Sequence, residues 1–83
     1  MTKTLIYDQS FSTTDLGLVS CLITLKFPLY DIDKSSPHKV QFFFKRISEL
    51  DKAVEGYWNN TLKVSPLEFF NNIKLIKNRI YSE

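Results

Sequence analysis

The stretch KVQFFFK, residues Lys39–Lys45, decides how this chain folds. Side chains of a β-strand alternate between its two faces, so Phe42 and Phe44 fall on one face, whereas Phe43 and Lys45 fall on the other. Such alternation is typical of a central strand with one buried face and one half-solvated face. The apolar segments before and after this stretch would pack on its buried face, and we expect it to form the floor of the core.

Composition limits both the architecture and the function of the chain. Its 83 residues suit one domain, so we expect residues 1–83 to form a single small α+β unit. With 43% hydrophobic residues and only two glycines and three prolines, the chain has the composition of a folded protein. The net charge of +2 is too small to indicate a nucleic-acid or membrane partner by itself.

The N-terminal part predicts a strand followed by a helix. Residues Thr4–Tyr7 read as a short strand, and a turn follows them. Ser12 is expected to cap the helix, with Asp15 at its third position as an approximate capping box. The helix should end at about Lys26, because Pro28 disfavours helical geometry in the residue before it.

This first helix is apolar around most of its circumference. A narrow strip of small residues, Gly17, Ser20 and Thr24, interrupts the apolar surface. A helix of this kind is either sandwiched inside a domain or buried by a partner. In the first alternative a sheet covers one side and another helix covers the next, and in the second the helix is an oligomer interface, such as that of a homodimer.

Three further elements adjoin the phenylalanine-rich strand. Leu29–Ile32 should pair with it as an antiparallel hairpin. Ser48 is expected to cap a second helix, which Asn59 and Asn60 end because asparagine tolerates the left-handed conformation that closes helices. Thr61–Val64 alternates as a short fourth strand.

The final helix has the strongest local signal in the chain. Ser65 caps it, Pro66 takes the first helical position and Glu68 completes the capping box. The predicted order is therefore β-α-β-β-α-β-α, a ferredoxin-like (split βαβ) arrangement with an added C-terminal helix. A three-stranded α+β sandwich is the alternative. In the ferredoxin-like arrangement one face of the sheet is open unless the last helix covers it.

Residues for catalysis or metal binding are scarce. Asp31, Asp33 and His38 could approach a divalent cation, but no fourth ligand is evident, and a solvated hairpin loop is the favoured interpretation. Cys21 lies on an apolar face, where a cysteine behaves as a small hydrophobe. No nucleophile, metal-site or phosphate-loop motif occurs. We therefore expect no enzymatic activity, no cofactor, no metal and no small-molecule substrate.

A non-catalytic protein-binding module is the leading hypothesis. The apolar first helix could form a homodimer or bind a partner, and Trp58 at the edge of the second helix is the other candidate anchor. Tryptophan is enriched among residues that dominate binding energy, although covering the core is the safer interpretation of a tryptophan at this edge. The partner would be another protein or a second copy.

A single-stranded nucleic-acid binder is the alternative hypothesis. RNA-recognition domains share this strand and helix order and stack bases on aromatic residues of the central strands. Phe43 would be the stacking residue, with Lys45 and Arg46 beside it and Lys74 and Lys77 contributing charge. The glycines of the RNA-recognition strand are absent, so ordinary core with a solvated rim is the favoured interpretation of these residues.

The sequence also predicts a compartment. The first residues lack the apolar run and the small-residue cleavage site of a signal peptide. No segment reaches the length of a membrane span. Cys21 is the single cysteine, so an intrachain disulfide is excluded. We expect a cytoplasmic protein with no membrane partner.

Four short motifs stand out: F-x-T-x-D-L from Phe11, V-x-F-x-F from Val40, Y-W-N from Tyr57 and K-x-x-K-x-x-I-Y from Lys74. In these motifs the whole chain resembles a family of short bacterial and archaeal domains with no assigned function. The resemblance implies an architecture and transfers no activity or site residues. It is compatible with a mobile-element or phage setting, in which small proteins act by binding and blocking a host protein.

Overall fold

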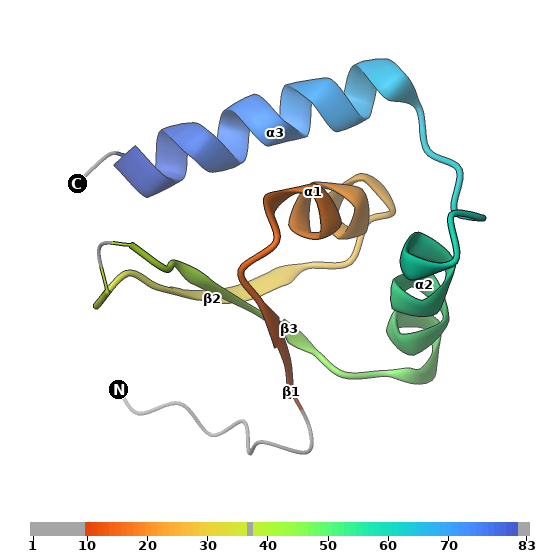
Figure 1. Cartoon of the computed structure of the whole chain (residues 1–83), viewed down its shortest axis with the longest axis horizontal. Coiled ribbons are helices and arrows are strands. Elements are labelled where there is room, and N and C mark those ends of the chain that lie inside the picture. The colour runs from red at the N-terminus through yellow and green to blue at the C-terminus, as the bar shows by residue number, and fades with distance from the viewer. Residues whose placement is uncertain (1–9, 37, 82–83) are drawn as a thin grey trace.

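A computed structural model of the chain describes residues 10–36 and 38–81 (Figure 1). The elements are β1 (Ser10–Thr13), α1 (Leu16–Thr24), β2 (Leu29–Asp33), β3 (Gln41–Lys45), α2 (Ser48–Trp58) and α3 (Pro66–Tyr81). The fold is small α+β, as the sequence predicts. The strand expected at Thr4–Tyr7 lies outside the described residues.

The phenylalanine-rich strand is the centre of the sheet, as predicted. The strand order is β1-β3-β2, and both edge strands run antiparallel to β3. Phe42 and Phe44 are buried, whereas Phe43 and Lys45 point to the opposite face. The hairpin of β2 and β3 is confirmed, with an irregularity in β2 between Leu29 and Asp31. The edge strands are parallel to each other and joined through α1, which is a split βαβ unit.

The fourth strand is not formed. Residues 61–64 are irregular, so the observed order is β-α-β-β-α-α and the ferredoxin-like arrangement is not confirmed. The backbone N–H groups of Thr61 and Leu62 donate to the Gly56 carbonyl, at 2.9 and 3.2 Å, and thereby close α2. Leu62 and Val64 are half-buried while Lys63 is exposed, so the alternation in the sequence reflects packing of a connecting segment.

The start of α1 differs from the prediction. Ser12 belongs to β1 and lies opposite Phe43 of β3, so it does not cap the helix. The N-cap is Asp15, whose Oδ1 accepts hydrogen bonds from the backbone N–H groups of Gly17 and Leu18, at 2.9 and 3.2 Å. Both residues are of types that cap helices. Pairing with β3, which is remote in sequence, placed residues 10–13 in the sheet and left the later residue as the cap.

Both short helices end in a left-handed residue. Helix α1 ends at Thr24, two residues before the end that the sequence predicts at Lys26. Lys26 has a left-handed φ of 77°. The Phe27 N–H then donates to the Leu22 carbonyl at 3.0 Å, a bond that characterises the Schellman motif. Helix α2 closes in the same way through Asn60, with a φ of 62°, which confirms its predicted end.

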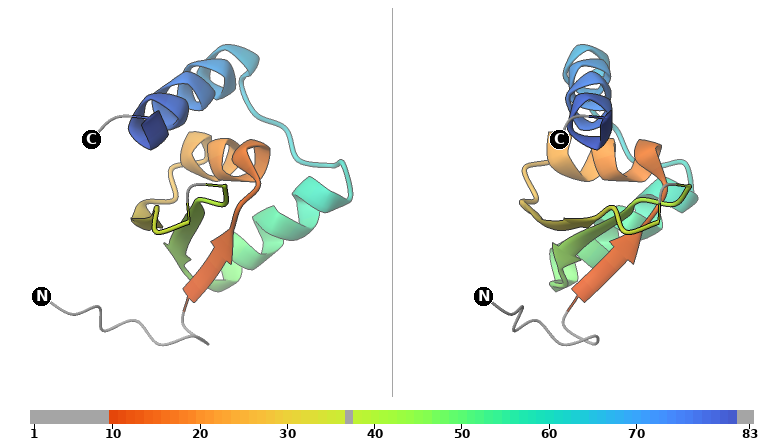
Figure 2. Two further views of the ribbon diagram at one scale, coloured as in Figure 1. Left: turned by 60° about the vertical axis from the view of Figure 1, so that its left-hand side comes forward. Right: turned by 90° about the vertical axis from the view of Figure 1, so that its left-hand side faces the viewer.

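All three helices lie on one side of the sheet, with α1 between the sheet and α3 and with α2 beside α1 (Figures 1 and 2). The core is formed by Leu18, Val19, Leu22, Phe42, Phe44, Leu50, Ala53 and Ile76. The sandwiched alternative for α1 is therefore correct. The chain's own sheet and helices bury most of α1, so this helix leaves little surface for a dimer or partner interface.

The strip of small residues on α1 faces the neighbouring helices. The Thr24 hydroxyl donates to the Ser20 carbonyl at 2.7 Å and accepts a hydrogen bond from the Asn72 side chain of α3 at 2.9 Å. Gly17 lies under the Tyr57 hydroxyl of α2, where an added Cβ would lie 2.7 Å from that oxygen. Small side chains on α1 thus allow α2 and α3 to approach closely.

Gly17 and Gly56 should respond oppositely to alanine. We expect Gly17→Ala to lower the free energy of unfolding by about 1–3 kcal/mol, because its Cβ overpacks against Tyr57. Gly56→Ala meets only ordinary contacts of 3.4 Å or more and should raise stability by about 0.5–1 kcal/mol. In a Tyr57→Phe background, which lacks the hydroxyl, Gly17→Ala should also become stabilising. Urea unfolding measures all three, and a loss in Gly17→Ala that persists in that background contradicts the close approach.

Candidate partner-binding surface

Trp58 is a strongly exposed candidate site residue. It is the last residue of α2, and 65% of its surface is accessible. Its ring lies edge to face against Tyr57, with the centroids 5.0 Å apart and the planes at 79°. Beside the two rings is an open hollow of about 490 Å³, lined also by Cys21, Asn60 and Leu62. A partner's side chain could enter this hollow and contact the tryptophan.

Tyr57, whose ring contacts Trp58, also joins two helix ends. The Tyr57 hydroxyl donates to Asp15 Oδ2 at 3.2 Å. Because Asp15 is also the N-cap of α1, the end of α2 is tied to the beginning of α1. The ring that Trp58 contacts is therefore itself tied to α1.

The floor of the hollow is uncharged at neutral pH. Burial first, and then the charge of Asp15, raise the pKa of the Cys21 thiol. The same two causes in the same order, together with the hydrogen bond to Asp15, raise the pKa of Tyr57. A buried thiol with a raised pKa is a poor nucleophile, so these groups offer a neutral surface for contact.

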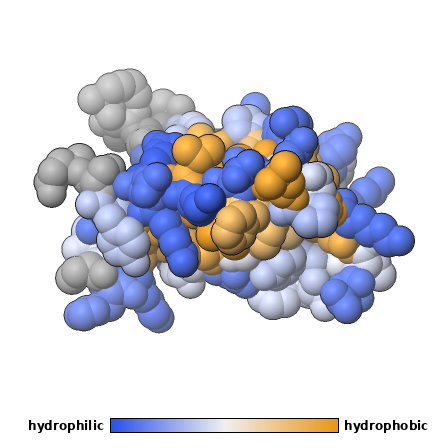
Figure 3. All heavy atoms as spheres, turned by 90° about the horizontal axis from the view of Figure 1, so that it is seen from above, coloured by the Kyte–Doolittle hydropathy of each residue, from blue (hydrophilic) through white to orange (hydrophobic). Residues whose placement is uncertain are grey.

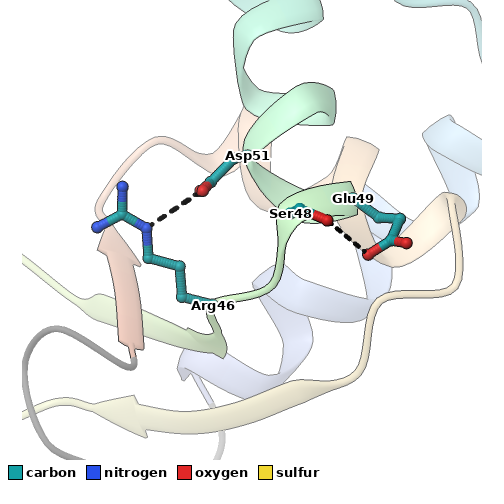
Figure 4. Close-up of polar contacts among 4 residues, drawn as sticks. All are labelled: Arg46, Ser48, Glu49 and Asp51. Atoms are coloured by element: carbon teal, nitrogen blue, oxygen red, sulfur yellow. Dashed lines mark hydrogen bonds and ion pairs between the residues drawn. The ribbon is translucent and has the colours of Figure 1, made fainter.

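The outer face of the sheet carries the residues of the nucleic-acid hypothesis. Phe43 is half-buried on the face opposite α1, and Lys45 beside it is exposed. Asp31 lies directly across from Phe43 on β2, which sets a carboxylate beside the proposed stacking ring. The Arg46 Nε–H donates to Asp51 Oδ1 at 3.1 Å (Figure 4), so this guanidinium is turned towards α2.

The start of α2 corrects one further expectation. Ser48 is the first helical residue and does not act as the cap. Its hydroxyl donates to Glu49 Oε1 at 3.3 Å (Figure 4), and the capping residue is Ile47, which has no side-chain acceptor. Glu49 and Asp51 in the first turn instead place negative charge at the positive end of the helix dipole. At the start of α3, by contrast, Ser65 caps as predicted and accepts the Glu68 N–H at 3.4 Å.

The six predicted binding residues lie on different parts of the molecule. Lys74 and Lys77 belong to α3, which packs on α1 and is separated by that helix from the outer face of the sheet (Figure 2). Trp58 is at the C-terminal end of α2. The structure brings together only the sheet residues at the end of β3.

Four of the five residues that line the hollow are not among the predicted binding residues. The sequence predicts an inert apolar role for Cys21, a core position for Tyr57, a helix end at Asn60 and a strand at Leu62. The contribution of the last two depends on the closure of α2, which turns the chain back beside Trp58. The signal in the sequence is the pair Asn59 and Asn60, because asparagine tolerates the left-handed conformation that Asn60 adopts here with a φ of 62°.

Metal binding and membrane insertion find no support in the part of the chain that the structure describes. Within residues 10–36 and 38–81 no three His, Cys, Asp or Glu side chains are grouped as metal ligands. Asp33 instead accepts the backbone N–H of Ser35 at 2.9 Å, which lowers the pKa of its carboxyl group. None of the described helices has the length and apolar character needed to cross a bilayer.

Comparison with known proteins identifies one family. The family model described as Domain of unknown function (DUF5659) matches residues 8–82. No curated protein and no solved structure matches the chain. The match spans all six described elements.

Stability should fall at alkaline pH because of the groups in the hollow. Raised pKa values of Cys21 and Tyr57 stabilise the folded state fully below the unfolded-state value of about 8.5 for cysteine, and this contribution is lost as the pH rises through the folded values. We expect the urea midpoint to stay level from about pH 6 to 8 and then to fall. The fall should be shallower in Cys21→Ala and in Tyr57→Phe. An alkaline fall of equal steepness in both variants contradicts this assignment.

Proposed function

This chain belongs to the family Domain of unknown function (DUF5659), and we propose that it is a non-catalytic module that binds another protein through Trp58. The observation that carries the proposal is the 65% exposure of a tryptophan that lines a neutral hollow. Leaving so large an apolar ring in water forgoes the stabilisation that burial would supply. A partner that covers Trp58 would recover it.

The surroundings of Trp58 suit an anchor residue. Energetically dominant residues of interfaces are enriched in tryptophan and sit in pockets from which binding excludes water. Trp58 is supported on one side by the ring of Tyr57, and the adjacent hollow can receive a side chain of the partner. Tyr57 itself is held by Asp15, so the anchor is organised before binding.

The proposal extends to the kind of action. A module without catalytic groups acts by occupying the surface of its partner, as an inhibitor or an adaptor does. We place this action in the cytoplasm, where the single buried thiol of Cys21 would stay reduced. A phage or mobile-element protein that blocks a host protein is one setting in which such a module would work.

Trp58→Ala tests the anchor. Loss of the contact with Tyr57 should cost less than about 1.5 kcal/mol of unfolding free energy, so the variant stays folded. Tagged wild-type protein and the tagged variant are used to capture partner proteins. Each captured protein is then purified, and its affinity for wild type and for Trp58→Ala is measured by titration. We expect the dissociation constant to rise about 30-fold or more, because hot-spot residues contribute at least about 2 kcal/mol.

Ile47→Ala is the matched control for this measurement. Ile47 is an exposed apolar residue at the opposite end of α2, 42% accessible, and its loss should leave affinity unchanged. Since Trp58 is the single tryptophan, its fluorescence should also change when the partner binds. Equal affinities for wild type and Trp58→Ala, with no change in fluorescence, would remove the proposal.

Single-stranded nucleic-acid binding is the second candidate. It is favoured by the position of Phe43, whose face of the sheet none of the described helices covers (Figure 2). It is disfavoured by Asp31 across from that ring and by the ion pair of Arg46 with Asp51, which leave Lys45 as the adjacent cation. We rank it below protein binding for this reason.

Fluorescence anisotropy with labelled single-stranded DNA and RNA decides the second candidate. If the outer face binds nucleic acid, affinity will weaken steeply with salt and will fall on Phe43→Ala, because stacking contributes about 1–3 kcal/mol per base. Asp31→Asn should strengthen this binding by removing a repulsive charge. We expect no binding at physiological salt, and binding that responds to both substitutions would reverse the ranking.

A further inference from the structure

The side of α3 that faces away from the core carries a regular seam. It consists of Leu67, Phe70, Lys74, Lys77 and Tyr81, spaced by alternating steps of three and four residues. This 3-4 spacing keeps side chains on one face of a helix and is the spacing of the contact positions in coiled coils. The accessible fractions are 68% for Leu67, 56% for Phe70 and 81% for Tyr81.

The seam is clear of the chain's own core. The opposite side of α3 packs on α1 through the buried Ile76 and through the hydrogen bond from Asn72 to Thr24. Seen from the α3 side, hydrophobic side chains gather on the surface among hydrophilic ones (Figure 3). A helix of this length could therefore accept a second helix along its outer side.

The centre of the seam is positively charged. The Lys74 Nζ lies 4.8 Å from the centroid of the Phe70 ring, a cation–π contact that directs the ammonium group over the apolar surface. Lys77 follows one turn later. The single carboxylate of α3 is Glu68, outside the seam positions. The surface thus has apolar ends, Leu67 with Phe70 and Tyr81, and a cationic centre.

This charge distribution distinguishes between three possible partners of the seam: a second copy of the chain, a membrane surface and an acidic helix. Two copies of the seam, paired in either direction along their length, would bring the central lysines against each other, and like charges at such positions oppose pairing. A membrane surface is also a poor fit, because interfacial helices carry lysine on the polar face and Lys74 lies in the middle of the apolar one. A helix with carboxylates at its centre complements both the charge and the apolar ends.

We propose that the α3 seam binds an amphipathic helix of a partner protein that has apolar residues at its two ends and Asp or Glu between them. The partner's apolar residues cover Leu67, Phe70 and Tyr81, and its carboxylates pair with Lys74 and Lys77. The seam shares no residue with the Trp58 hollow, so this proposal does not depend on the anchor proposed above.

A displayed library of helical peptides tests the seam. The peptides share one scaffold helix and are randomised at the positions that would contact the seam, and they are sorted with the full chain. The enriched peptides are then titrated against wild-type protein, Phe70→Ser, Lys74→Glu and Trp58→Ala. Leu75→Ser is the matched control, because Leu75 is 58% accessible on α3 and lies outside the seam.

We expect acidic residues at the central randomised positions and apolar residues at the ends. Phe70→Ser and Lys74→Glu should each weaken binding at least tenfold, whereas Leu75→Ser and Trp58→Ala should change it less than about twofold. Replacing the peptide's central acid by lysine should restore binding to Lys74→Glu. Thermal melts of each variant confirm that the fold is retained.

Several results would overturn the inference. They are a sort that yields no binders, binders with basic centres, and binders indifferent to Phe70 and Lys74. If only Trp58→Ala loses peptide binding, the peptides bind at the Trp58 hollow, and the proposal for the α3 seam is wrong. Sedimentation with phosphatidylglycerol vesicles that Phe70→Ser abolishes would assign the seam to membranes, and a dimer in analytical ultracentrifugation that the same substitution dissociates would assign it to self-association.

Discussion

The packing of α1 on the inner face of β3 is the contact on which the rest of the structure depends. Phe42 and Phe44 supply the floor, and Leu18 and Leu22 lie in the same buried cluster. Burying each of these side chains is worth about 1.5–3 kcal/mol, a large share of the stability available to a small domain. Since α1 is apolar on several sides, one sheet cannot cover it, and α3 covers the side that the sheet leaves open.

This arrangement decides which surfaces remain for function. Placing α3 on α1 turns one side of α3 outward and leaves the opposite face of the sheet without a covering helix among the described elements (Figure 1). The interior of so small a domain is used for stability, and the hollow beside Trp58 is open to solvent.

One polar contact joins α1 and α2 beside that core. Asp15 caps α1 and accepts the hydroxyl of Tyr57, and Gly17 provides the space for it. The same tyrosine that joins α1 to α2 contacts the ring of Trp58. Local structure and the candidate site are linked here, because a change at Gly17 acts on the tryptophan through Tyr57.

The sequence by itself determined those features that depend on neighbouring residues. Alternation identified the buried Phe42 and Phe44, Ser65 with its following proline identified the start of α3, and Asn60 the end of α2. The tertiary structure alone decided that Ser12 joins a strand, since its partner on β3 is remote in sequence. It also decided that residues 61–64 form no strand and that α3 covers α1. For the same reason the six predicted binding residues lie on different parts of the molecule. Strand pairing and helix packing minimise the exposed apolar surface of the whole chain, a quantity that no short segment contains.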